Sequence, residues 1–216
     1  MIKGVIFDLD GVLVSTDALH FKAWGRLAKE LGIHDFTEAD NKRQRGVSRM
    51  ESLEVVLEKQ NKAFTEEEKF QMTERKNAYY VEMLQELTGE AVLAEVIDAL
   101  NMLKAKGILI GVGSVSKNTP AILERTGLAG YIDKVSCGLD ITRSKPDPEV
   151  FNIAAEKLGL SSSECLVVED SEAGVIAAKA ADMVSLGVGP NYKDLGATYC
   201  SPTLMTGVNW EAILNA

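Results

Sequence analysis

Short apolar runs rich in β-branched residues recur along the chain and predict the strands of a sheet. They lie at residues 4–10, 108–114, 131–137, 165–170 and 183–189. Several runs are continuously apolar and do not alternate with polar residues. This pattern is typical of strands that are buried on both faces of a parallel sheet.

Helical segments separate the later runs, at residues 92–107, 118–127, 147–159 and 171–181. Their ends carry helix signals such as Pro120 near a start and Gly159 after an end. Strand and helix therefore alternate from residue 92 onward. The alternation predicts a doubly wound, Rossmann-like α/β domain with a parallel sheet.

A helical insert interrupts this rhythm after the first run. Apolar residues recur at helical spacing over residues 16–31. Capping-box patterns follow at "SRME" (48–51) and at "TEEE" (65–68), and the second opens a long helix predicted to reach Leu87. We therefore expect an α/β core formed by residues 1–14 and 91–216, with a helical domain over residues 15–90.

Charge and composition narrow the class of protein. The 216 residues are 46% hydrophobic and carry a net charge of −9, which argues against a nucleic-acid surface. We find no basic N-terminal region followed by an apolar stretch, and no apolar run near the ~20 residues that span a membrane. The three cysteines have spacings that match no disulfide or metal framework. We expect a cytoplasmic monomer with reduced thiols, and no nucleic-acid or membrane partner.

Polar residues collect where the predicted strands end. Because ligands bind beyond the carboxyl ends of the strands in open α/β sheets, we expect these side chains at one edge. The strand ends and following loops supply Asp8, Asp10, Ser114, Ser116, Asn118, Lys145, Glu169 and Asp170.

The residue types at this edge point to phosphoryl chemistry with a divalent cation. Carboxylates of the first and fourth runs would face each other and repel, and Mg²⁺, which prefers oxygen ligands, relieves that repulsion. Ser114 and Lys145 suit a phosphate group. If residues two apart in a strand point the same way, Asp8 can attack phosphorus while Asp10 serves as general acid and base.

Each motif alone has a simpler interpretation. An Asp-x-Asp pair occurs by chance or as a helix cap, Lys145 alone would be a solvated lysine, and Ser171 or Asp170 could cap a helix. The arrangement of four strand ends in order favours a functional site.

Four segments together resemble the motifs of the haloacid dehalogenase superfamily. They are "FDLDG" (7–11), "SVS" (114–116), "SKPDPE" (144–149) and "VVEDS" (167–171), and the helical insert resembles that family's helical cap domain. The resemblance implies an α/β core with an inserted cap. It implies phosphorylation of Asp8, acid/base catalysis by Asp10, and phosphoryl binding by Ser114 and Lys145. It also implies Mg²⁺ held by Asp8, the Asp10 backbone carbonyl, Glu169 and Asp170.

Segments of the insert resemble one branch of that superfamily more closely. They are "HFKAW" (20–24), "GVSRMESL" (46–53) and "RKNAYY" (75–80), together with "SVSKN" (114–118). This branch interconverts β-D-glucose 1-phosphate and D-glucose 6-phosphate through an aspartyl-phosphate enzyme and β-glucose 1,6-bisphosphate. The resemblance implies a phosphosugar-binding set of His20, Trp24, Gly46, Arg49, Lys76, Ser116 and Asn118.

In that set, Arg49 would bind the phosphate that is not reacting, and His20 would support the closed cap near Asp10. Taken singly, His20 could be structural, and Arg49 and Lys76 could be solvated. The chain departs from the family pattern at Arg45, where a lysine is expected, and over residues 138–143. Sugar preference therefore stays open. So do two alternatives, a Mg²⁺-dependent sugar-phosphate phosphatase and a non-catalytic phosphosugar-binding protein.

Overall fold

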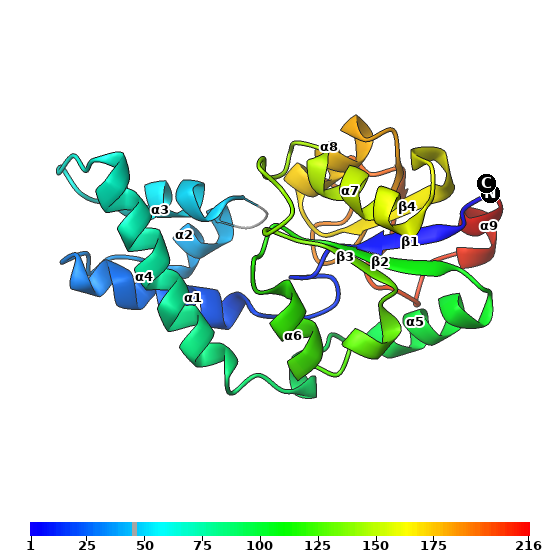
Figure 1. Ribbon diagram of the computed structural model, residues 1–216, viewed down its shortest axis with the longest axis horizontal. Helices are drawn as coiled ribbons and strands as arrows, with labels where there is room; N and C mark the ends of the chain where they lie inside the picture. Colours follow the sequence, from blue (N-terminus) through cyan, green and yellow to red (C-terminus); the bar gives the residue numbers. More distant parts are fainter. Residues whose placement is uncertain (45–46) are drawn as a thin grey trace. The chain divides into compact units, whose positions relative to one another are not determined.

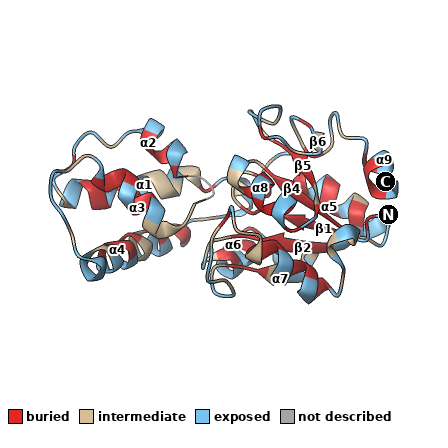
Figure 2. Ribbon diagram, turned by 90° about the horizontal axis from the view of Figure 1, so that it is seen from above, coloured by how far each residue is buried: buried red, intermediate tan, exposed pale blue. Residues whose placement is uncertain are grey.

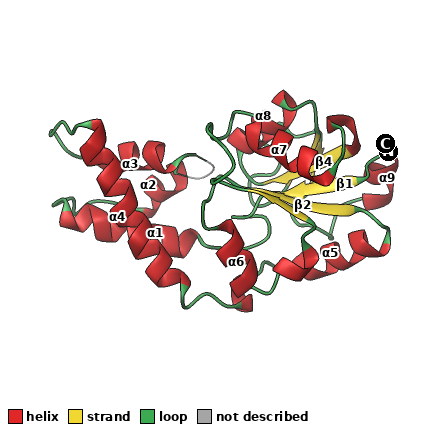
Figure 3. Ribbon diagram, viewed as in Figure 1, coloured by secondary structure: helices red, strands yellow, loops and turns green. Residues whose placement is uncertain are grey.

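The chain divides into two compact units, which we describe separately. A computed structural model describes residues 1–44 and 47–216. Residues 1–15 and 88–216 form the α/β domain, and residues 16–87 form the helical domain. The sheet belongs to the first, whereas the described part of the second contains helices and loops (Figure 3).

A parallel sheet lies at the centre of the α/β domain (Figure 1). Its strand order is β3-β2-β1-β4-β5-β6, with every neighbouring pair parallel. This order confirms the predicted doubly wound, Rossmann-like fold. The strands are β1 (Gly4–Phe7), β2 (Leu109–Gly113), β3 (Lys134–Ser136), β4 (Cys165–Glu169), β5 (Val184–Gly187) and β6 (Tyr199–Cys200).

Helices cover both faces of this sheet. They are α5 (Val96–Ala105), α6 (Thr119–Arg125), α7 (Glu149–Leu158), α8 (Glu172–Ala180) and α9 (Trp210–Asn215). α7 and α8 pack on one face, and α5 lies on the other (Figure 1). Between the sheet and α7, Ile6, Phe151 and Val167 form part of a fully buried core (Figure 2). Burial of this apolar surface fixes the strands whose ends carry the polar residues.

Local backbone conformation shifts some predicted boundaries. α5 begins at Val96 and not at residue 92, because Glu95 adopts the left-handed conformation with φ 67° and interrupts the helix there. Residues 129–131 form a short 3₁₀ turn, so β3 is shorter than the apolar run that predicted it. The two-residue strand β6 and the terminal helix α9 were not predicted.

Capping residues set the helices of the helical domain, which are α1 (Asp17–Glu30), α2 (Glu38–Arg43), α3 (Arg49–Leu57) and α4 (Glu66–Leu84). Ser48 and Thr65 form the predicted capping boxes at the starts of α3 and α4. α4 ends at Leu84, one turn before the predicted Leu87. Trp24, Leu27 and Leu53 belong to the buried core of this domain.

The two connections between the domains lie side by side within the α/β domain. Val14 and Val92 form an antiparallel bridge. Ser15 N–H donates to Ala91 O at 2.8 Å. The chain ends are also adjacent, because Ile2 N–H donates to Leu214 O at 2.9 Å. Among the described residues, none of the helices has the length and apolar character needed to cross a membrane.

Candidate active site

The candidate site begins where β1 and β4 end. β1 lies between β2 and β4, so the strand order reverses beside it, and ligands bind at such a switch point. Asp8 directly follows β1, and its N–H donates to Val168 O at 2.9 Å, which extends the pairing. Glu169 ends β4 and Asp170 comes next. The pairing of two neighbouring strands thus brings the carboxylates of both segments together.

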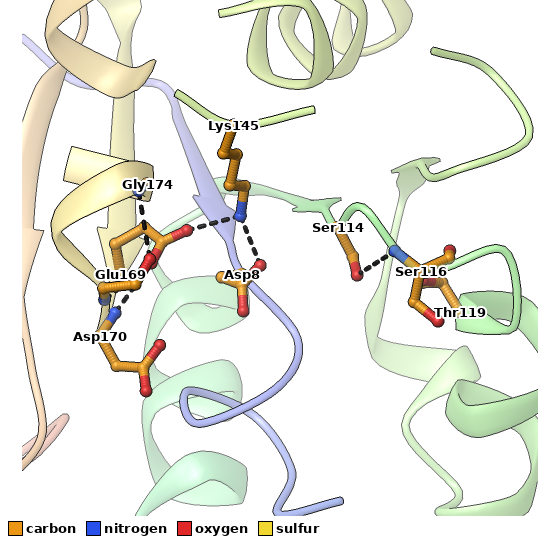
Figure 4. A network of polar contacts seen from close by, with 9 residues as sticks. Asp8, Ser114, Ser116, Thr119, Lys145, Glu169, Asp170 and Gly174 are labelled. Atoms are coloured by element: carbon orange, nitrogen blue, oxygen red, sulfur yellow. Dashed lines mark hydrogen bonds and ion pairs between the residues drawn. The ribbon is translucent and has the colours of Figure 1, made fainter. Parts of the chain in front are cut away.

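A buried lysine links these carboxylates (Figure 4). Lys145 Nζ donates to Asp8 Oδ1 and to Glu169 Oε1, each at 2.5 Å. The Lys145 side chain is only 1% exposed, and its ammonium group lies 4.7 Å from the centre of the Phe151 ring. A buried charge requires such partners, because water does not solvate it. The network therefore fixes Asp8 in position and pairs Lys145 with two carboxylates.

Electrostatics in this network act in opposite directions. Burial raises the pKa of Asp8 above its ordinary range; Lys145 opposes the shift, and Glu169 and Asp170 add to it. Burial alone would lower the pKa of Lys145, but the attraction of Asp8 and Glu169 outweighs it and the pKa is raised. Lys145 is therefore a permanent cation, and a further cation near Asp8 would keep that carboxylate ionised.

The loop that carries Lys145 is held by the first residue of α7. The Glu149 carboxylate accepts the N–H groups of Thr142 and Arg143 at 2.9 and 2.6 Å. Residues 138–143, which matched the family pattern less well, thus end in a clamped turn. The two hydrogen bonds fix the backbone two and three residues before Lys145.

Glu169 is held by the start of the next helix. Its Oε2 accepts hydrogen bonds from Asp170 N, Ser171 N and Ser171 Oγ at 3.0, 3.1 and 2.9 Å. Ser171 Oγ in turn accepts Gly174 N–H, so Ser171 does cap α8. A Cβ atom at Gly174 would lie 1.9 Å from Glu169 Cδ, which shows how closely the helix backbone approaches the carboxylate.

Three acids offer oxygen atoms for a cation. Ligand atoms of Asp8, Glu169 and Asp170 all lie within 4.8 Å of one another. A cluster of carboxylates with one lysine retains negative charge, and hard oxygen donors suit Mg²⁺. Gly11 lies close to Asp170: its φ is +90°, and a Cβ there would lie 2.0 Å from Asp170 Oδ2. The residues present fit Mg²⁺.

Asp10 is positioned by a turn and not by strand alternation. β1 ends at Phe7, so the two-residue strand spacing used to relate Asp8 and Asp10 does not apply. The turn is closed by Gly11 N–H donating to Val14 O at 2.8 Å. Asp10 is half-buried and follows Asp8 by two residues at the carboxyl end of the sheet.

The loop after β2 supplies hydroxyl groups. Ser114 is 3% exposed, and its N–H donates to Ser136 O at 3.0 Å. Ser114 Oγ accepts Ser116 N–H, and Ser116 Oγ accepts Asn118 N–H, both at 3.2 Å. A hydroxyl that accepts a hydrogen bond can still donate its own proton. Ser114 thus suits a phosphoryl oxygen, and Ser116 lies in the same loop (Figure 4). Asn118 follows Ser116 by two residues.

A second group of candidate residues lies within the helical domain. Lys76, 3% exposed, lies 2.8 Å from His20 Nδ1, and its ammonium group lies 4.8 Å from the ring centres of Trp24 and Tyr80. Since an ammonium group can only donate, Nδ1 must accept. Burial lowers the pKa of His20 most strongly, and the positive charges of Lys76 and Arg49 lower it further. The neutral ring therefore orients Lys76.

Arg49 begins α3 and is paired with a glutamate of α4. Its Nη1 lies 2.7 Å from Glu74 Oε1, and the side chains are 21% and 49% exposed. Burial lowers the pKa of Arg49, while Glu74 counteracts this effect. Because Arg49 also acts on His20, it belongs to the same positive region as Lys76.

Two predicted positions, Gly46 and Arg45, lie outside the described residues. The sequence reasoning missed Gly11, Gly174, Tyr80 and Glu74. Tyr80 lies one helical turn after Lys76, and this spacing could have identified it. The glycines next to acidic motifs were a weaker signal, since only the packed structure shows how little space is left for a side chain.

Comparison with known proteins gives this geometry a context. A family model described as a haloacid dehalogenase-like hydrolase matches residues 2–182. A β-phosphoglucomutase of Bacillus subtilis is 39% identical over 197 residues, covering 90% of this chain and 87% of that protein. A phosphorylated carbohydrates phosphatase of Thermotoga maritima is 34% identical over 182 residues, covering 83% of this chain and 81% of that protein.

Solved structures give a similar result. The crystal structure of a β-phosphoglucomutase from Clostridium difficile has a TM-score of 0.90 and 35% identity, and the match covers 100% of this chain and 96% of that one. The chain is thus similar along most of its length to both a mutase and a phosphatase.

Proposed function

The chain belongs to the haloacid dehalogenase-like hydrolase family of enzymes, and on that premise we propose that it is a Mg²⁺-dependent β-phosphoglucomutase. It would interconvert β-D-glucose 1-phosphate and D-glucose 6-phosphate through an aspartyl-phosphate enzyme and β-glucose 1,6-bisphosphate. The observation that carries the phosphoryl-transfer part of the proposal is the buried network in which Lys145 joins Asp8 to Glu169. The choice of a mutase rests on residues of the helical domain and on the relative in Bacillus subtilis.

In the first half-reaction, an Asp8 carboxylate oxygen attacks the phosphorus of the bisphosphate. The bond between phosphorus and the sugar oxygen breaks, and Asp10 gives its proton to that oxygen. Lys145 balances negative charge beside Asp8, and Ser114 donates a hydrogen bond to a phosphoryl oxygen. The products are phosphorylated Asp8 and a glucose monophosphate.

The second half-reaction reverses these roles. Asp10, now a carboxylate, takes the proton of the sugar hydroxyl that attacks the phosphorus, and the bond to Asp8 breaks. Asp8 is regenerated as a carboxylate and Asp10 as an acid, so protons balance over the cycle. One acid/base residue can serve both steps because the second is the reverse of the first.

Mg²⁺ would be held by Asp8, Glu169 and Asp170 together with the backbone carbonyl of Asp10, and it would supply charge neutralisation for the phosphoryl group. Lys145 cannot do this alone, because one cation faces three acids. Glu169 also fixes the position of Lys145.

The helical domain supports a mutase over a phosphatase. A mutase must bind a second phosphate that is not being transferred, and we assign it to Arg49, whose planar fork suits phosphate oxygens. Lys76, Ser116 and Asn118 would contact the sugar phosphate, with His20 and Trp24 orienting Lys76. The counterpart in Bacillus subtilis favours the same activity.

A sugar-phosphate phosphatase is the second candidate, favoured by the 34% identical phosphatase of Thermotoga maritima. The two activities differ only in whether a sugar hydroxyl or water accepts the phosphoryl group from Asp8. The test is a coupled assay with β-glucose 1-phosphate, Mg²⁺ and catalytic bisphosphate, run beside an assay of free phosphate. Formation of glucose 6-phosphate faster than phosphate release is expected. Stoichiometric phosphate release without glucose 6-phosphate would assign the chain to the phosphatases.

We also propose that the protein is a monomer located in the cytoplasm. Its three cysteines are free thiols, of which Cys137 and Cys165 are buried and Cys200 is exposed, and free thiols suit a reducing compartment.

A further inference from the structure

The ion pair between Arg49 and Glu74 involves the cation that the proposed mutase reserves for a phosphate. Glu74 lies on α4, two residues before Lys76, and its Oε1 is 2.7 Å from Arg49 Nη1. About half of the Glu74 side chain is exposed, whereas Arg49 is mostly covered. Glu74 thus lies at the solvent side of the pair.

The ion pair between Arg49 and Glu74 differs from an ordinary surface salt bridge because another cation lies in the same part of the domain. The positive charges of Arg49 and buried Lys76 both lower the pKa of His20, so two cations occupy the same part of the domain. Glu74 brings a carboxylate to that region at hydrogen-bond distance. A carboxylate and a phosphate are recognised by the same N–H groups of a guanidinium fork.

We propose that Glu74 is an internal competitor for Arg49, so that its carboxylate sets the affinity of the enzyme for phosphosugars. The substrate phosphate that is not transferred displaces Glu74 from Arg49, or shares the fork with it at an electrostatic cost. A dianionic phosphate competes well because it brings more charge and more acceptor oxygens than a carboxylate. A neutral sugar would leave the pair closed. This inference rests on the proposed function, because it concerns the phosphate that we assign to Arg49.

Competition affects binding and not the chemical step. Removing the carboxylate should therefore lower KM and leave kcat unchanged, since the interaction is the same in the ground state and in the transition state. A partly exposed ion pair corresponds to about a two- to fivefold change in affinity. Acetyl phosphate has no second phosphate, so its reaction with Asp8 should not change.

The test compares Glu74→Gln with Glu82→Gln. Glu82 lies on the same helix, is 67% exposed and pairs with Arg26 at 3.0 Å, so its substitution removes an equal charge from a similar ion pair. KM for β-glucose 1-phosphate should fall about two- to fivefold in Glu74→Gln only. In an Arg49→Ala background the same substitution should have no effect. An unchanged or raised KM, an equal effect of Glu82→Gln, or persistence of the effect without Arg49 would each overturn the proposal.

A binding measurement separates this inference from the proposed activity. Calorimetry with glucose 6-phosphate and Mg²⁺ is run in Asp8→Asn, with and without Glu74→Gln. Tighter binding on loss of the carboxylate, in a protein whose parent converts no β-glucose 1-phosphate, would refute the mutase and uphold the competition. Mutase activity without tighter binding would refute the competition alone. No binding of glucose 6-phosphate to either variant would refute both.

Discussion

Replacing Gly174 by alanine tests the idea that α8 holds the carboxylate network in place. The added Cβ would lie 1.9 Å from both Cδ and Oε1 of Glu169 and 2.4 Å from Oε2, so Glu169 or the helix must move. Glu169 makes four hydrogen bonds, one of them from Lys145. Overpacking costs about 1–3 kcal/mol, and loss of hydrogen bonds to a buried group costs about 1–3 kcal/mol more. Alanine's better helix propensity returns about 0.5–1 kcal/mol. We expect a net loss of about 1–5 kcal/mol in the free energy of unfolding.

The catalytic rate of Gly174→Ala should also fall. A misplacement of about 1 Å at a catalytic group costs on the order of 10²-fold in rate, and Glu169 positions Lys145 against Asp8. Urea unfolding and initial rates with Mg²⁺ would measure the two effects. Gly25→Ala is the matched control, because Gly25 lies inside α1 and a Cβ there meets no atom within 4 Å. Native stability and rate in Gly174→Ala would refute the reasoning, since the helix would then have room for a side chain.

Three further substitutions test other parts of the molecule. Asp10→Asn should lower kcat about 10²–10⁴-fold while calorimetry still detects Mg²⁺ binding; a joint loss of metal and activity would contradict an acid/base role. Arg49→Ala should reduce kcat/KM for β-glucose 1-phosphate about 10- to 150-fold, the equivalent of a charge-assisted hydrogen bond, with acetyl phosphate turnover as the unaffected control; equal losses would contradict phosphate binding. Hydrogen bonds from the Thr203 and Thr206 side chains and from backbone N–H groups lower the pKa of Glu95 from 4.5 to about 2. The stabilisation by the ionised Glu95 is therefore complete above pH 4.5 and is lost as the pH falls towards 2. Glu95→Gln should therefore flatten that part of the acid unfolding curve measured by circular dichroism, and an unchanged curve would contradict the assignment.

The elements that could be predicted were those with a strong local signal. Continuous apolar runs identified β1, β2, β4 and β5, because strands buried on both faces need apolar residues throughout. The helix α2 was missed, since its six residues "EADNKR" carry no apolar periodicity. It begins with a capping box in which Asp40 accepts Thr37 N–H at 2.7 Å, a local signal that the sequence reasoning overlooked. Asp40 also pairs with Lys59 at 3.2 Å, and hydropathy does not predict a contact between segments so far apart in the sequence.

The candidate site divides in the same way. Asp8, Lys145 and Glu169 could be proposed from sequence because strand ends meet at one edge of a parallel sheet. The pairing of Arg49 with Glu74 could not, because it depends on how α3 packs against α4. The need for glycine at residue 174 could not be predicted either, since the sequence does not show how near the helix comes to Glu169.

The bridge between Val14 and Val92 makes the helical domain a removable module. The chain leaves and re-enters the α/β domain through two segments that are already paired, so from the viewpoint of the sheet the insert is equivalent to a hairpin turn. Joining residue 14 to residue 92 through a short turn would leave β1, β4 and the Asp8 network intact, because the cost of closing a loop depends only weakly on its length. Under the proposed function, exchanging the insert would replace Arg49 and Lys76, whereas Asp8, Lys145 and Glu169 belong to the α/β domain and would stay in place.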